Sequence, residues 1–111
     1  MRILSFPEQI PKGEIVMIKH CIMIKLKDNS EQTKTEVKNR LLSMDGKVTM
    51  MRSLEVVSDF LSSPRSYDIF LCCTLDDEKA LDDYQNDPYH CEIKAYLKGI
   101  SESIIAVDAN V

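Results

Sequence analysis

The segment Tyr67–His90, which reads YDIFLCCTLDDEKALDDYQNDPYH, contains a strand-like run, an acidic helical stretch and an Asp-Pro break. Its first part, up to Leu75, is a continuous apolar run of the kind found in buried strands. The acidic stretch that follows predicts a helix to about Gln85, with Asp76 or Asp77 as its N-cap. A strand that leads into a helix in this way suits a small domain in which helices pack on a sheet.

The Asp-Pro pair within this segment predicts the start of a second helix. Asp87 can cap it, and Pro88 suits its first position, where a proline lacks no needed hydrogen bond. This helix runs to about Lys98, and Gly99 stops it. The last strand is expected over residues 101–108, whose central part, residues 104–107, is apolar.

Upstream of this segment, residues 17–27 alternate between two faces, which predicts a strand that carries His20 on its more apolar face. A short polar turn then leads into a helix over about residues 31–44, which ends near Gly46 because glycine suits the left-handed position after a helix. A second strand is expected over about residues 49–58.

The elements therefore follow in the order β-α-β-β-α-α-β, which predicts an α+β fold of the ferredoxin-like kind, with an antiparallel sheet and helices on one face. The strands over 67–75 and 101–108 are apolar on both faces, whereas a sheet with one wet face alternates polar and apolar residues. A second copy is expected to cover the open face, giving a homodimer through the sheet face, a dimeric α/β barrel. We expect this domain to occupy residues 17–111, after a Pro-containing N-terminal arm over residues 1–16.

Composition narrows the possible partners and the compartment. The net charge is −4, and residues 67–111 contain 10 Asp and Glu against 3 Lys. No basic stripe is present, so no nucleic-acid partner is expected. No apolar run approaches the roughly 20 residues that span a membrane, and the apolar character of the N-terminus is interrupted too early for a signal peptide. We expect no membrane association and a cytoplasmic location.

The four cysteines, Cys21, Cys72, Cys73 and Cys91, are interpreted as small buried hydrophobes in a reducing compartment. Neighbouring residues on a strand point to opposite faces, so Cys72 and Cys73 are poorly placed to pair with each other. Cys91 is interpreted as a packing residue, because it and His90 point about 100° apart on a helix.

The chain has only two histidines, His20 and His90, and histidine is the side chain best suited to move protons near neutral pH. Tyr84 ends one predicted helix, and His90 lies in the first turn after the break. Both can face a cleft between helices and sheet, into which His20 would point. A histidine with a pKa near ~6.5 suits a general base, and a tyrosine hydroxyl can stabilise charge on a carbonyl oxygen.

These residues lie within a pattern that resembles a known family. The matching pieces are Met17-Ile18-Lys19-His20, Leu54-Glu55-Val56, Tyr67-Asp68, Leu81-x-x-Tyr84-x-x-Asp87-Pro88-x-His90 and Val107-Asp108. Over residues 17 to about 109 the chain resembles the Dabb family, the stress-responsive dimeric α/β-barrel domain. The resemblance implies a dimer closed by two sheets. One plant member of the family is a polyketide cyclase that needs no cofactor, and by resemblance its catalytic base falls on His90 and its supporting residues on Tyr84 and His20.

The first functional hypothesis is accordingly a pocket for a small, partly apolar, carbonyl-containing ligand, with a possible cofactor-free cyclase or isomerase activity. His90 would be the general base, and Tyr84 and His20 the supporting residues. No cofactor is expected. No metal is expected either, because a site needs three or four ligands and Asp87 is better used as a helix cap.

The alternative is a non-enzymatic, very stable stress or scaffold dimer. In that case His90 locks the helix break, His20 is a satisfied core histidine, and Tyr84 packs with its hydroxyl at the rim. This hypothesis expects Leu71→Asp to break the dimer. A third hypothesis is a module that binds a basic partner through the acidic helix over 76–83.

Overall fold

The computed structural model describes residues 17–111, so the predicted arm over residues 1–16 lies outside the described part. The elements follow in the order β1 (Ile18–Leu26), α1 (Glu31–Leu42), β2 (Ser53–Ser58), β3 (Ile69–Leu75), α2 (Glu78–Asn86), α3 (Pro88–Ile100) and β4 (Ser101–Asn110). The predicted order is confirmed. The first helix ends earlier than predicted and the second strand begins later, because a series of turns fills the stretch between them, including Gly46 with φ +82°.

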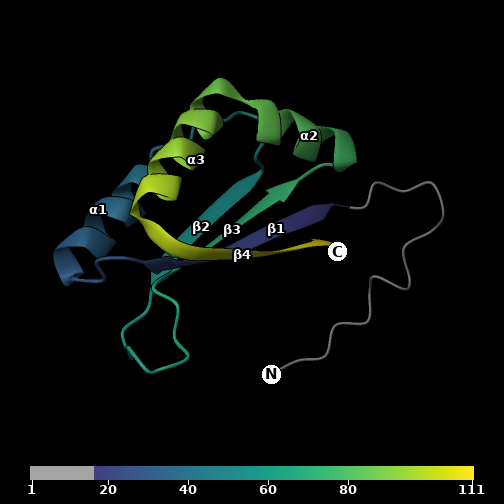
Figure 1. Cartoon of the computed structure of the whole chain (residues 1–111). Coiled ribbons are helices and arrows are strands. Elements are labelled where there is room, and N and C mark those ends of the chain that lie inside the picture. The colour runs from purple at the N-terminus through teal and green to yellow at the C-terminus, as the bar shows by residue number, and fades with distance from the viewer. Residues whose placement is uncertain (1–16) are drawn as a thin grey trace.

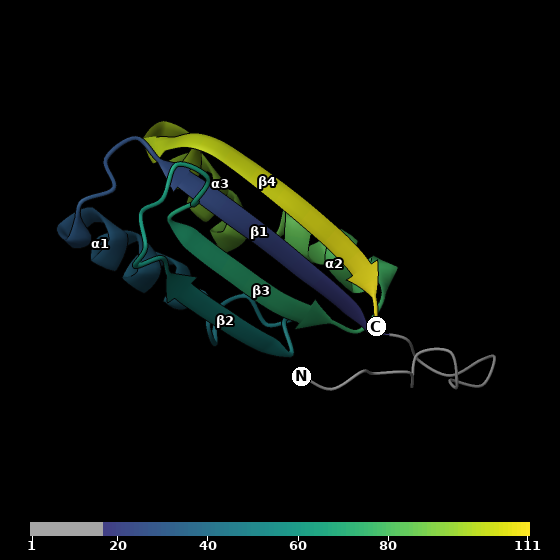
Figure 2. The same ribbon diagram turned by 90° about the horizontal axis from the view of Figure 1, so that it is seen from below.

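One antiparallel sheet with the strand order β2-β3-β1-β4 forms the base of the molecule. The three helices lie on the same side of this sheet, and the other side is open (Figure 1; Figure 2). This arrangement confirms the predicted ferredoxin-like α+β fold. Because β1 is central, His20 lies opposite Cys73 of β3 on one side and opposite Asp108 of β4 on the other.

The core lies between the sheet and the helices, and β3 shows how the strands divide their side chains. Its buried residues alternate with half-buried ones, so Leu71 and Cys73 face the helices while Phe70 and Cys72 face the open side. Leu71 is 1% exposed. The expectation that Leu71→Asp tests the dimer is therefore wrong, because this side chain belongs to the core of one chain.

The open side of the sheet carries a set of large apolar side chains that nothing in the described chain covers. We call it the open face, and its exposed members are Met23, Val57, Ile105 and Val107. Val107 is 65% exposed. Exposed apolar surface of this kind marks an interaction site, in agreement with the prediction that a second sheet packs here.

The cysteines agree only in part with the prediction. All four are free, and Cys73 is buried as expected. Cys91 is exposed, so it is not the packing residue that the sequence predicted. The sulfur atoms of Cys21 and Cys72 lie 3.3 Å apart on the open face, because β1 and β3 place these two residues directly opposite each other.

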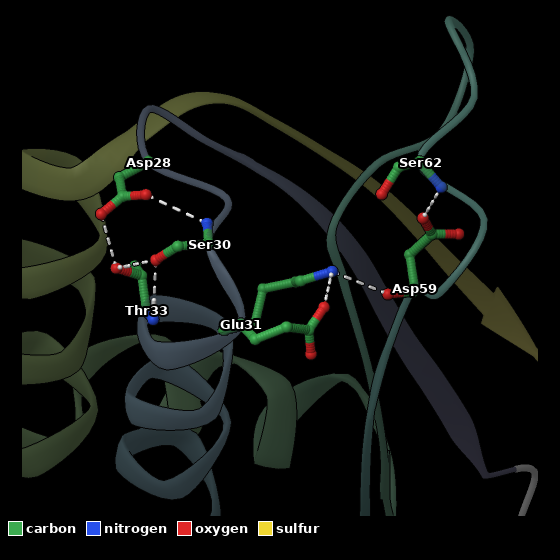
Figure 3. Close-up of polar contacts among 7 residues, drawn as sticks. Asp28, Ser30, Glu31, Thr33, Asp59 and Ser62 are labelled. Atoms are coloured by element: carbon green, nitrogen blue, oxygen red, sulfur yellow. Dashed lines mark hydrogen bonds and ion pairs between the residues drawn. The ribbon is translucent and has the colours of Figure 1, made fainter.

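A buried lysine connects α1 to the loop between β2 and β3. Lys34 is 2% exposed; its Nζ donates a hydrogen bond to the carbonyl oxygen of Asp59 at 3.0 Å and lies 3.0 Å from a carboxylate oxygen of Glu31. The side chain of Asp59 accepts in turn from the backbone N–H of Ser62, which has φ +54°. Figure 3 shows these contacts beside the N-cap of α1, where the hydroxyl of Ser30 accepts a hydrogen bond from a backbone N–H of the first turn.

Candidate functional site

A cavity of about 310 Å³ lies between the β1–β4 side of the sheet and the helices α2 and α3. Its lining residues are Ile22, Leu97 and Ile104, which are apolar, and His20, Gln85, His90, Lys94 and Lys98, which are polar. The volume suits a small organic molecule. The cavity brings together both histidines of the chain, although 70 positions separate them in the sequence.

His20 reaches the cavity from β1 and is held by the last strand. Its Nδ1 contacts the Oδ1 atom of Asp108 on β4, directly across the strand pair. His20 is buried, whereas the side chain of Asp108 is 42% exposed and does not line the cavity. Such a contact fixes which way the imidazole ring is turned.

Tyr84 lies behind the cavity, in contact with both imidazole rings. Its ring centroid is 5.3 Å from that of His20 in an edge-on arrangement and 3.9 Å from that of His90 in a tilted stack. Tyr84 is 1% exposed and is not among the lining residues. Burial, together with the neighbouring Cys73 thiol, raises the pKa of Tyr84 above its usual range, so the hydroxyl stays protonated. The structure gives this residue the geometry of a positioning residue.

His90 is placed by the break between α2 and α3. Asp87 ends α2 and caps α3, and its carboxylate accepts a hydrogen bond from the backbone N–H of His90 at 3.0 Å. The ring is buried, and its Nδ1 has no hydrogen-bond partner among the described residues. A buried polar atom without a partner costs about 1–3 kcal/mol, so this nitrogen is a candidate for contact with a ligand.

The charge state of His90 differs from the sequence-based expectation of an ordinary pKa. Burial, together with the nearby Lys94 and His20, lowers the pKa of His90 to about 4. The ring is therefore neutral at pH 7, with one nitrogen able to accept a proton. A negative charge on a bound molecule would raise this pKa again, because opposite charges favour the protonated imidazole.

Three residues at the candidate site were not predicted from the sequence. Asp108 was noted only as part of a closing Val107-Asp108 motif, and its role depends on the register between β1 and β4. Lys94 and Lys98 could have been found from helical spacing, since they follow His90 at intervals of four residues and so share its face of α3. Within residues 17–111 no group of three or more His, Cys, Asp or Glu is placed to hold a metal ion.

The family of the chain follows from its sequence as a whole. Residues 18–111 match the Dabb family, whose description is the stress responsive A/B barrel domain, so the chain belongs to this family. This confirms the resemblance found at the His20 and His90 motifs. No curated protein matches the chain. No helix within residues 17–111 has the length and apolar character needed to cross a membrane.

Several solved structures are similar in fold. A dimeric ferredoxin-like protein of unknown function from Bacteroides fragilis has 25% identity and a TM-score of 0.71, covering 86% of this chain and 96% of its own. A Dabb family protein from Mesorhizobium loti has 18% identity and a TM-score of 0.67, with 85% and 95% covered. The hydroxynitrile lyase from Passiflora edulis has 11% identity and a TM-score of 0.74, with 88% and 95% covered. The last two show the fold alone.

Proposed function

We propose that this Dabb domain binds a small, partly apolar carbonyl compound in the cavity between sheet and helices. The observation that carries the proposal is the buried, unpartnered Nδ1 of His90 at a cavity of about 310 Å³. The apolar wall would hold the body of the ligand, and the imidazoles would meet its polar part. An enzyme occurs among proteins of this fold, the hydroxynitrile lyase from Passiflora edulis, so the fold can house a reaction.

We propose in addition that His90 acts as a general base without any cofactor. The proton would leave the carbon next to the carbonyl and move to His90, while the electron pair moves onto the carbonyl oxygen to form an enolate. The low pKa of the empty site does not exclude this step, because the growing negative charge on the ligand strengthens the base as the proton moves. Tyr84 and the His20–Asp108 pair would hold the two rings in place.

The test is hydrogen–deuterium exchange into the methyl group of acetophenone, followed by NMR in heavy water, with the shifts of the two histidine rings recorded alongside. We expect the protein to accelerate exchange and His90→Gln to reduce the acceleration by about 10²-fold or more, the range of general-base catalysis. Cys91→Ser, an exposed neighbour, is the matched control and should behave like the wild type. An exchange rate in His90→Gln equal to that of the wild type would contradict the proposal that His90 is the base. Histidine ring signals that do not move when acetophenone is added would contradict the proposed pocket.

A second candidate function is a non-enzymatic stress or scaffold dimer, and the apolar open face favours it. In this proposal the stable dimer itself supplies the activity, and the histidines are structural. Survival of cells under heat stress distinguishes the two functions. If only the dimer is needed, cells with His90→Gln should survive as well as cells with the wild type, while cells with Val107→Lys, on the open face, should not.

We also propose a cytoplasmic location. All four thiols are free, which suits a reducing compartment. The cross-strand pair Cys21 and Cys72 lies close enough that an oxidising compartment would favour its oxidation. Fractionation of cells that make the tagged protein tests this location, and recovery outside the cytoplasm would overturn it.

A further inference from the structure

Positive charge is concentrated at the cavity in a part of the chain that is otherwise acidic. Residues 67–111 contain 10 Asp and Glu but only three basic residues, which are Lys79, Lys94 and Lys98. Two of these three lysines line the cavity, and within residues 17–111 no Asp or Glu lines it. Because acidic residues outnumber lysines in this stretch, an even distribution of charge would place more acidic residues than lysines at the cavity.

The two cavity lysines also differ from the third in their partners. Lys79 forms an ion pair with Asp83 at 3.1 Å. Within residues 17–111, by contrast, no carboxylate lies within 4.0 Å of Lys94 or Lys98. Lys94 donates to the carbonyl oxygen of Gln85 at 3.0 Å, at the end of α2, and Lys98 makes no hydrogen bond in this part of the chain. Their charges are therefore available to an anion.

A separate observation at the same cavity concerns the imidazole ring of His90. His90 is 6% exposed, and its Nδ1 has no partner within the described residues. His90, Lys94 and Lys98 follow one another along one face of α3, so the lysines lie about 6 Å and about 12 Å from His90 along the helix axis. The opposite wall is apolar and includes Ile22 and Ile104.

We propose that the ligand of this cavity is an oxo-carboxylate, whose carboxylate is bound by Lys98 and Lys94 while its carbonyl group lies at His90. The apolar part of the molecule would rest against Ile22 and Ile104, with its long axis parallel to α3. This inference rests on the proposed function, since it names the substrate class of the same pocket. Two lysine ammonium groups are a common means of binding a carboxylate, through charge-assisted hydrogen bonds.

The experiment compares benzoylbutyrate, which has a ketone, a phenyl ring and a carboxylate, with its primary amide, which has nearly the same size and shape but no charge. Both are titrated into the full chain while the ring signals of His20 and His90 are followed by NMR. We expect the acid to bind about tenfold more tightly than the amide, as is typical for one charged hydrogen-bonded group. Lys98→Gln should abolish this preference, and Lys98→Arg should restore most of it.

Lys38→Gln is the matched control, because it removes the same charge from α1, away from the cavity, and should keep the tenfold preference. Thermal melts confirm that each variant is folded. Equal binding of acid and amide, with the histidine signals shifted by both, would contradict the proposal that the ligand is a carboxylate. It would still support a pocket for a carbonyl compound. Binding of neither would overturn both proposals. A preference that survives in Lys98→Gln would contradict the assignment of the carboxylate to Lys98.

Discussion

At the scale of single residues, the two histidines differ in how their rings are held. His20 has a carboxylate partner on the neighbouring strand, while His90 is buried with one nitrogen that has no partner among the described residues. Tyr84 lies between them and contacts both rings. Any change at one histidine therefore has a path to the other through one aromatic ring.

The pKa of His90 predicts how stability changes with pH. This pKa is about 4 in the folded protein, against an ordinary value of 6.5. Between these two values the unfolded chain binds a proton at His90 and the folded chain does not, so the free energy of unfolding rises with pH across this window. As the pH falls from 6.5 to 4, we expect the contribution of His90 to fall by up to roughly 3 kcal/mol.

Urea denaturation of the wild type and of His90→Gln at several pH values between 4 and 7 checks this prediction. The variant should lose less stability than the wild type over the window, whatever the difference between the two at pH 7. The carboxylates of the chain titrate in both proteins and so cancel in the comparison. Parallel curves, or a His90 ring that titrates near 6.5 by NMR, would contradict the burial argument.

At the scale of elements, Asp87 connects α2 to α3 and so sets the position of His90. Its carboxylate is the N-cap of α3, and Asp77 has the same role at the start of α2. We expect Asp87→Ala and Asp77→Ala each to lower the free energy of unfolding by about 1 kcal/mol, the usual cost of losing such a cap. Only Asp87→Ala should move the ring signals of His90. Two variants with equal effects on these signals would show that the cap does not place the ring.

The order of the elements could be predicted from the sequence because each boundary has a local signal. Ser30, Asp77 and Asp87 are N-caps in the structure, and Pro88 begins the last helix as expected. The stretch between α1 and β2 could not be predicted, because its turns are held by backbone contacts such as that from Val48 N–H to the carbonyl oxygen of Met44.

Contacts between strands are the part of the site that the sequence could not provide. The sequence alone does not show which residues of neighbouring strands lie opposite each other. This register places His20 opposite Asp108 and Cys21 opposite Cys72. The sequence also could not show which face of β3 packs against the helices, because both faces are apolar. The cavity residues on α3 share one helical face and were within reach of a spacing argument.

At the scale of the whole molecule, the open face predicts self-association. Val107 is 65% exposed there, and the similar protein from Bacteroides fragilis is dimeric. We expect sedimentation to show a dimer at micromolar concentration and Val107→Lys to weaken it at least about tenfold, because a buried lysine without a partner is costly. Leu42→Lys, which changes an exposed apolar residue of α1, should leave the dimer intact. Sedimentation of the wild type as a monomer at this concentration would contradict the prediction that the open face is an interface.

The contact between His20 and Asp108 joins the first strand of the described domain to its last, across 88 residues. On a ribosome that adds roughly 5–20 residues per second, the first of these residues is made about 4–18 s before the second. During that interval β1 can pair with β3, but its other edge has no neighbour, since β4 does not yet exist. An unpaired edge is a template for wrong pairing. The site is therefore the last part of this domain that a newly made chain completes, and a nascent chain that stalls before β4 carries an open edge and lacks the part of the pocket wall that Ile104 supplies.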